Sequence, residues 1–192
     1  MKTQPSIKIS PNLSGNRPIH VGISEIVVSE ANFEIKTTLG SCVAVLLYTT
    51  GERKLCSLSH FLLPQSPQEN IHNNGSVYED KSKGDNFKLQ DMKYGDRLIP
   101  RQIRDLKNRV KKSDTIYAKI FGGANSPGYQ KNRLLANIGN KNVALANSIL
   151  EEYHIEVTGS SVGGTSARTV SYVPEQMKAN VYEMESEQLF IV

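Results

Sequence analysis

Two neighbouring apolar segments with a short polar turn between them constrain this chain most strongly. Cys42 to Tyr48 carries no charge, and a second segment from Lys54 to Leu62 follows the polar residues Thr49 to Arg53. Runs of this length bounded by turn residues are typical of a buried β-hairpin. The apolar run is far shorter than the roughly 20 residues that span a bilayer, and the N-terminus has no apolar signal core. We therefore expect a cytoplasmic protein without membrane insertion.

The patterns on both sides of this hairpin predict a mixed α/β fold. Apolar residues alternate from His20 to Val28 and from Phe33 to Thr37, which predicts two further strands. Two later segments have apolar residues spaced by three or four, as on one face of a helix: Ile99, Ile103, Leu106 and Val110, and then Val143, Ala146, Leu150 and Tyr153. Four more strands are expected at Thr115–Phe121, Ile155–Thr158, Ala167–Val173 and Lys178–Met184. We predict a single-domain α/β sandwich with mixed, largely antiparallel sheets and two main helices.

The length of 192 residues favours one folded domain. Residues 1–19 are polar and contain proline, and we interpret them as a flexible N-terminal extension to a domain at 20–192. Residues 65–92 are rich in Asn, Ser, Gly, Asp and Lys and predict a long polar loop. Gly163-Gly164 lacks the spacing of a phosphate-binding loop and predicts a turn with positive φ.

The net charge of +4 comes largely from seven basic residues between Arg97 and Lys112. A basic cluster can bind nucleic acid or an acidic partner. On an amphipathic helix it is more often the solvated face, and we expect no nucleic-acid partner.

Cys42 and His60 are candidates for nucleophilic chemistry. Cys42 follows the turn Gly40-Ser41, so backbone N–H groups around Ser41 to Val43 could hold an oxyanion. Pairing Tyr48 with Lys54 across the hairpin places Cys42 opposite His60, where facing Cβ atoms lie roughly 4.5–5.5 Å apart. The alternatives are a buried apolar role for Cys42 and a surface or capping role for His60.

The second cysteine, Cys56, lies in the middle of its predicted strand and is expected in the core. Cys42, Cys56, His60 and His72 are the available soft metal ligands, but their spacing matches no metal motif. We predict neither a metal nor an organic cofactor.

Five short motifs follow one another along the chain. They are Leu39-Gly-Ser-Cys-Val-Ala-Val45, Ser59-His-Phe-Leu-Leu-Pro64, Ala118-Lys-Ile-Phe-Gly-Gly-Ala124, Ile138-Gly-Asn-Lys-Asn-Val143, and Val162-Gly-Gly164 with Arg168. In this order they resemble the signature of CheD, the chemoreceptor glutamine deamidase family of bacterial and archaeal chemotaxis. The resemblance spans about residues 20–185.

The resemblance implies a fold related to bacterial deamidating toxins and the activity of a protein-glutamine glutaminase, an amide hydrolase with a cysteine nucleophile. Carried onto this sequence, Cys42 is the nucleophile, His60 the base and Thr37 the third member, with Thr38 as the fallback. The implied substrates are glutamines on the cytoplasmic helices of chemoreceptors, which links the chain to sensory adaptation.

Two rival functions stay open. The resemblance also implies binding to a CheC-type phosphatase, so the chain could be a non-catalytic adaptor for that phosphatase or for a receptor. A general cysteine amidase or a transglutaminase-like enzyme would share the Cys–His chemistry and differ in substrate.

Overall fold

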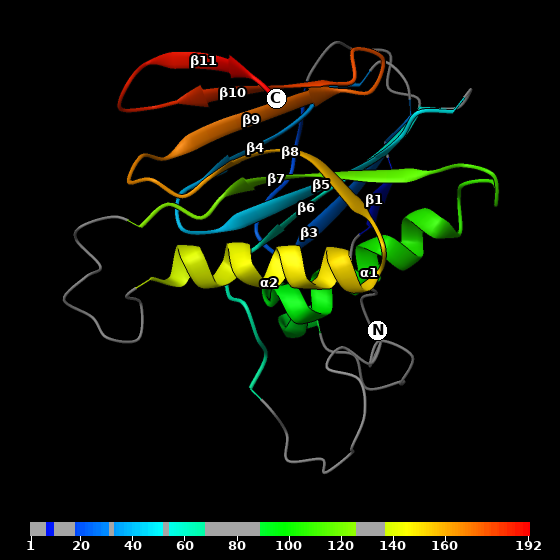
Figure 1. The fold of residues 1–192 in the computed structure, drawn as a ribbon, viewed down its shortest axis with the longest axis horizontal. Helices are drawn as coiled ribbons and strands as arrows, with labels where there is room; N and C mark the ends of the chain where they lie inside the picture. The colour runs from blue at the N-terminus through cyan, green and yellow to red at the C-terminus, as the bar shows by residue number, and fades with distance from the viewer. Residues whose placement is uncertain (1–6, 10–17, 31–32, 52–53, 68–88, 126–136) are drawn as a thin grey trace.

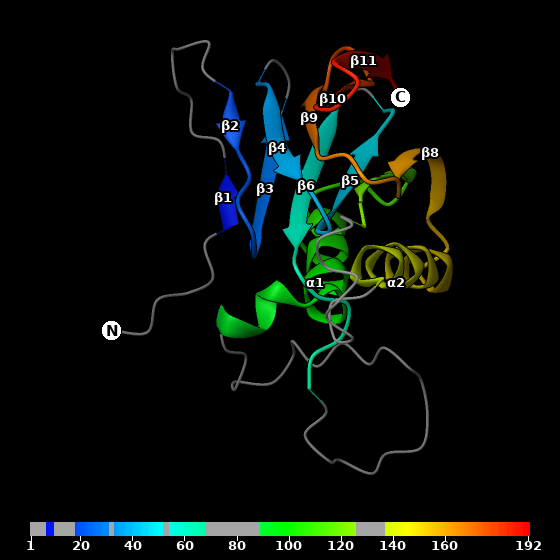
Figure 2. The same cartoon turned by 90° about the vertical axis from the view of Figure 1, so that its left-hand side faces the viewer.

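The computed structural model describes residues 7–9, 18–30, 33–51, 54–67, 89–125 and 137–192. These residues form three layers, with two helices on one face of a first sheet and a second sheet on its other face (Figure 1). The view turned by 90° shows α1 and α2 together on the same side of the first sheet (Figure 2). The predicted mixed α/β sandwich with two main helices is confirmed.

The first sheet has six strands in the order β1-β3-β6-β5-β7-β8, and the second has five in the order β11-β10-β9-β4-β2. Most neighbouring pairs are antiparallel, while β1–β3, β7–β8 and β2–β4 are parallel. The strands are β1 (Ile7–Ile9), β2 (Ile19–His20), β3 (Glu25–Glu30), β4 (Ile35–Leu39), β5 (Val43–Thr49), β6 (Leu55–Phe61), β7 (Ile116–Gly122), β8 (Glu156–Val162), β9 (Arg168–Val173), β10 (Lys178–Glu183) and β11 (Gln188–Ile191). The helices are the 3-10 helix η2 (Leu89–Lys93), α1 (Gly95–Lys107) and α2 (Ile138–Glu152).

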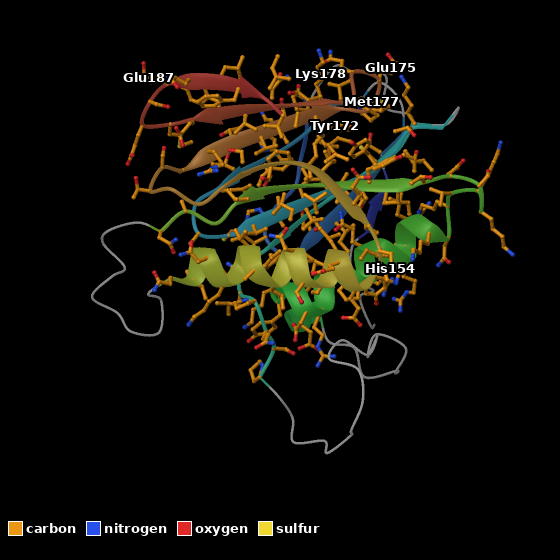
Figure 3. All side chains as sticks on the ribbon, in the orientation of Figure 1. His154, Tyr172, Glu175, Met177, Lys178 and Glu187 are labelled. Atoms are coloured by element: carbon orange, nitrogen blue, oxygen red, sulfur yellow. The ribbon has the colours of Figure 1, made fainter. Side chains whose placement is uncertain are left out.

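Strands β5 and β6 are central, and every residue in them is buried. Alternate side chains of a strand point to opposite faces, so one set packs under the helices and the other between the two sheets. Val43, Val45 and Phe61 belong to the helix-side core, whereas Ala44 and Leu58 belong to the inter-sheet core. Figure 3 shows the side chains that fill these layers, with Tyr172 of β9 labelled, and Tyr172 is 1% exposed in the inter-sheet core.

The predicted hairpin is confirmed, but its register differs from the prediction by two residues. Tyr48 pairs with Cys56 rather than with Lys54, and His60 therefore pairs with Ala44 rather than with Cys42. The cause is Thr49, which stays in β5 and accepts a hydrogen bond from the Leu55 N–H at 3.1 Å. A shift of two keeps every side chain on its face, because only an odd shift reverses the faces.

The structure differs from the expected elements at both ends of the chain. Within the range interpreted as an extension, Ile7–Ile9 pair with β3 as the edge strand β1. Strand β11 near the C-terminus was not predicted, and it pairs with β10. Of the predicted polar loop, residues 68–88 lie outside the described residues. None of the helices that the structure describes is long and apolar enough to cross a membrane.

Candidate active site

The loop that carries Cys42 joins β4 of the second sheet to β5 of the first, and donors from α2 and from the residues that follow β7 hold its carbonyl groups. The Gly40 and Cys42 oxygens accept hydrogen bonds from the Ala124 and Gly123 N–H groups, at 2.9 and 2.8 Å. The Ser41 oxygen accepts one from Asn142 Nδ2 at 2.9 Å. The C=O and N–H of a trans peptide point in opposite directions. The Ser41 and Cys42 N–H groups therefore point away from β7 and α2.

The Ser41 and Cys42 N–H groups are the available donors of this loop. Among the described residues, neither donates to a backbone carbonyl. Val43, also proposed from the sequence, lies in β5 and pairs with Phe61 and Gly122. Since the Cys42 oxygen bonds toward β7, the alternation of an antiparallel ladder turns the Val43 N–H toward β6.

Gly122 lets the end of β7 approach the cysteine loop closely. Its φ is +100°, and a Cβ at this position would collide with the Cys42 carbonyl oxygen. A side chain at residue 122 would therefore displace the carbonyl that anchors Cys42.

His60 lies near the end of β6 on the inter-sheet face and is 5% exposed. Its Nδ1 lies 2.9 Å from Thr37 Oγ1, and the Thr37 hydroxyl donates its only proton to the Val21 carbonyl oxygen at 2.7 Å. Thr37 Oγ1 must then accept from His60, so the neutral imidazole carries its proton on Nδ1. Nε2 keeps its lone pair, and it has no hydrogen-bond partner within the described ranges.

The two threonines considered for the third position have different surroundings. Thr37 is 2% exposed and contacts His60, as described above. Thr38 points to the opposite, exposed face of β4, where its Oγ1 lies 3.0 Å from Thr169 Oγ1. The structure therefore brings Cys42, His60 and Thr37 to one end of the inter-sheet layer and leaves Thr38 outside.

Burial sets the resting protonation of the thiol and the imidazole. Burial raises the pKa of the Cys42 thiol, and the N–H of the same residue acts in the opposite direction. Burial lowers the pKa of His60, against smaller opposing effects of a backbone hydrogen bond at Val21 and the charge of Glu25. At neutral pH both groups are uncharged, so His60 is ready to accept a proton rather than already holding one.

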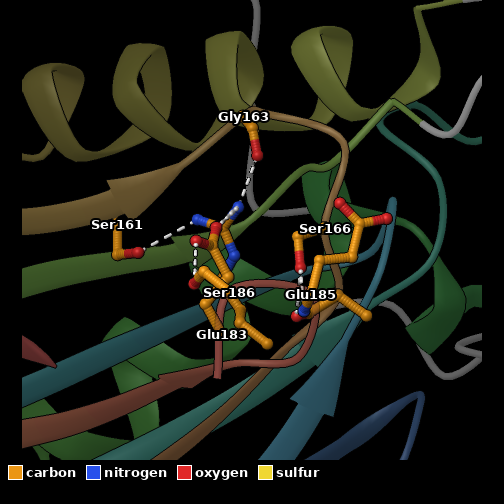
Figure 4. Close-up of polar contacts among 8 residues, drawn as sticks. Ser161, Gly163, Ser166, Glu183, Glu185 and Ser186 are labelled. Carbon is orange, nitrogen blue, oxygen red and sulfur yellow. Dashed lines mark hydrogen bonds and ion pairs between the residues drawn. The ribbon is translucent and has the colours of Figure 1, made fainter. Parts of the chain in front are cut away.

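A buried arginine supports the turn at Gly163, and Figure 4 labels its two partners Ser161 and Gly163. Arg168 is 3% exposed and donates to Ser161 Oγ at 3.0 Å and to the Gly163 carbonyl oxygen. Gly163 and Gly164 both have positive φ, as predicted. The Gly163 N–H donates to the Gly122 oxygen at 2.9 Å, so this turn is fastened to the end of β7.

Sequence reasoning missed Asn142 and Glu25. Asn142 is fully buried on α2 among Leu145, Ala146 and Ile149, and a polar residue on an apolar helix face was the available signal. Glu25 pairs with His60 across β3 and β6, which no local pattern indicates.

The other candidate ligands lie apart from Cys42 or beyond the described ranges. Cys56 is 0% exposed in the core, as expected. His72 lies outside the described residues. Within the described ranges, no group of three or more His, Cys, Asp or Glu side chains could hold a metal ion.

Comparison with known proteins identifies the relatives of this chain. A family model described as CheD chemotactic sensory transduction matches residues 78–183. A relative from Rhizobium etli (strain CIAT 652) is 32% identical over 169 residues, which are 88% of this chain and 80% of the relative. One from Clostridium botulinum (strain Eklund 17B / Type B) is 30% identical over 157 residues, 81% of this chain and 86% of the relative. One from Methanococcus vannielii is 31% identical over 152 residues, 79% of this chain and 86% of the relative. All three are named "Probable chemoreceptor glutamine deamidase CheD".

Proposed function

Because this chain belongs to the CheD family, we propose that it deamidates glutamine side chains on the cytoplasmic helices of chemoreceptors, with Cys42 as nucleophile. The relatives' names supply the substrate class. The family model begins after the candidate triad, at residue 78, so the roles of Thr37, Cys42 and His60 rest on the motif resemblance and on the hydrogen bonds of the site. The observation that carries them is the Thr37–His60 hydrogen bond, which leaves the Nε2 lone pair free on the face that Cys42 shares.

In the first half of the reaction, His60 Nε2 takes the proton of the Cys42 thiol as the sulfur attacks the carboxamide carbon of glutamine. The carbonyl oxygen becomes an oxyanion, and the Ser41 and Cys42 N–H groups donate to it. The C–N bond then breaks, the imidazolium gives its proton to the leaving nitrogen, and ammonia departs. The product of this half is a thioester between Cys42 and the receptor side chain.

In the second half, water attacks the thioester carbonyl while His60 accepts its proton. The C–S bond breaks, the proton returns to the Cys42 sulfur, and glutamate is released. Thr37 holds the imidazole in the tautomer that both halves need. No step uses a metal or an organic cofactor.

Each turnover replaces a neutral amide with a carboxylate on the receptor, and we propose that this change serves sensory adaptation. The interaction with a CheC-type phosphatase, and with it the adaptor function, stays a prediction. The relation of the fold to deamidating toxins likewise stays a prediction.

The proposal is tested by incubating the protein with a receptor cytoplasmic fragment and mapping amide-to-carboxylate conversion by peptide mass spectrometry. We expect conversion at a small number of glutamines, with release of an equal amount of ammonia. Cys42→Ala should reduce the rate by more than about 10⁴-fold, as loss of a nucleophile does in other hydrolases.

Cys56→Ala is the matched control, because it removes the other thiol from the same hairpin. Deamidation that survives Cys42→Ala would refute the nucleophile. Equal losses in the two cysteine variants would point to a general effect on folding and would also contradict the assignment.

A further inference from the structure

Helices α1 and α2 each have one buried amide side chain that donates hydrogen bonds to the backbone in or beside the β5–β6 hairpin. Gln102 of α1 lies over the middle of the ladder, where its Nε2 donates to the Val45 and Ser57 carbonyl oxygens, both at 2.9 Å. It is 0% exposed. This amide fastens the helix to two strands that already pair with each other.

Asn142 of α2 makes the same kind of bridge beyond the end of the ladder. Its Nδ2 donates to the Ser41 oxygen at 2.9 Å and to the Leu62 oxygen at 3.1 Å, outside the last pair, Val43 with Phe61. Asn142 is also 0% exposed. Here the amide replaces strand pairing, and it links the residue before the nucleophile to the segment that follows His60.

The orientation of this amide is fixed by its neighbours. Two carbonyl oxygens surround Nδ2, and a flipped amide would place Oδ1 against both of them. In the observed orientation Oδ1 is buried and has no partner in the part of the chain that the structure describes. An unpaired buried acceptor is destabilising, so it offsets part of the stability that the two donated hydrogen bonds supply.

The bond to Ser41 determines where the Cys42 N–H points. That N–H belongs to the same peptide unit as the Ser41 carbonyl and points in the opposite direction. We propose that Asn142 is the positioning residue that aims the Cys42 N–H at the oxyanion and holds the Cys42 loop against the strand of His60. The inference rests on the proposed function, because it assigns the geometry of that reaction.

The first test compares Asn142→Ala with Gln102→Ala, which removes a bridge of the same kind away from Cys42, together with the hydrogen bond that Gln102 Oε1 accepts from Ser59 Oγ at 2.7 Å. Both variants should lose thermal stability, and Gln102→Ala should lose at least as much as Asn142→Ala, because it removes one more buried hydrogen bond. Only Asn142→Ala should lose kcat, by about tenfold to a hundredfold, because displacing an oxyanion donor costs less than the roughly 10²–10³ of removing one. KM should stay within about threefold, since the donor acts on the transition state rather than on bound substrate. If the alanine variant does not fold, Asn142→Leu has nearly the same shape without the unpaired acceptor, and it should show the same loss of kcat.

A second measurement needs no substrate. The Cys42 N–H favours the thiolate of its own side chain, so misdirecting it should raise the pH at which iodoacetamide alkylates Cys42. Asn142→Ala should show this upward shift, while Gln102→Ala should match the wild-type profile. Substitution of a residue that only stabilises the fold would leave the pH dependence of Cys42 alkylation unchanged.

The outcomes separate the two proposals. If both variants behave alike in kcat and in alkylation, the positioning role of Asn142 is wrong while the deamidase function stands. If wild-type protein does not deamidate receptor fragments but Asn142→Ala still shifts alkylation, the proposed function is wrong and the positioning of the Cys42 N–H stands.

Discussion

The two cysteines belong to the same hairpin, and their surroundings differ in almost every respect. Cys56 lies within β6, pairs with Tyr48 and Ser29, and is 0% exposed. Cys42 precedes β5, and its carbonyl accepts from Gly123 while its own N–H stays out of the ladder. Burial raises the pKa of both thiols, and that of Cys56 lies far above the range of a free thiol.

His60 shares the inter-sheet face of β6 with Cys56. Side chains on one face of a strand are two residues apart, so Cys56, Leu58 and His60 form a row. Cys56 and Leu58 are buried in the inter-sheet core, whereas His60 at the end of the row pairs with Ala44, two residues after Cys42. Position along the strand, rather than residue type, thus separates a core thiol from a candidate nucleophile.

The largest expected difference between the cysteines is in alkylation. Cys42 is partly exposed, while Cys56 reacts only when the core opens. In native buffer, we expect iodoacetamide to modify Cys42 at least about 10³-fold faster than Cys56. Peptide mass spectrometry measures the extent of alkylation at each cysteine. In urea above the unfolding midpoint the two rates should converge. Comparable native rates would mean that Cys56 is not enclosed as described.

The next largest effect concerns Thr37 and its hydrogen bond to His60, since Cys56 has no such pair beside it among the described residues. Thr37→Val removes the acceptor of His60 Nδ1–H, so the imidazole loses its preferred tautomer. We expect kcat to fall about 10- to 100-fold, less than the roughly 10⁴ lost when a buried carboxylate in this role is replaced. Thr38→Val should stay within about twofold, because Thr38 is exposed and contacts Thr169 instead. A larger loss in Thr38→Val than in Thr37→Val would reverse the assignment.

A smaller effect is expected for Cys56→Ala. The substitution removes one buried atom from the inter-sheet core, which should lower the free energy of unfolding by about 1 kcal/mol. Urea unfolding should show a lower midpoint with an unchanged m-value. Deamidation by the folded variant should remain at the wild-type rate, and a lost rate with intact folding would give Cys56 a role in the chemistry.

The smallest effect concerns Glu25. In the register of β3 and β6, the acidic Glu25 pairs with His60, whereas the uncharged Ser29 pairs with Cys56. The His60 pKa lies below its ordinary value of about 6.5, so the acidic limb of kcat/KM should lie below that pH. Glu25→Gln removes a charge that raises this pKa, so the limb should move to still lower pH. Glu156→Gln on the exposed side of β8 is the control. A move to higher pH would contradict the sign of the Glu25 effect.

The sequence predicted the elements better than their register. Alternation located β4 and helical spacing located α1 and α2, because these patterns follow from burial of one face, while apolar segments bounded by turn residues located β5 and β6, which are buried on both faces. The hairpin register was wrong by two, since it depends on whether Thr49 belongs to the strand or to the turn. Its hydroxyl contact with Leu55 N–H decides this, and no local pattern reports that contact.

The sequence motifs predicted only part of the candidate site. Cys42 and His60 were found from spacing and resemblance, but the choice between Thr37 and Thr38 needed the face of β4 that meets β6. Asn142 contacts Ser41, which is 101 positions away in the chain. Contacts at such separations depend on how whole layers pack, so single-sequence patterns do not reveal them.

The Thr37–His60 hydrogen bond joins the two sheets, since Thr37 belongs to β4 of the second sheet and His60 to β6 of the first. Neither sheet carries all three candidate residues, and Cys42, the proposed nucleophile, lies on the segment that crosses between the sheets. A sliding of one layer over the other by a fraction of a hydrogen-bond length would separate base from orienting hydroxyl before any strand was lost. If the proposed deamidation holds, its kcat should depend on how tightly the two sheets pack, so substitutions in the inter-sheet core far from Cys42 should lower kcat.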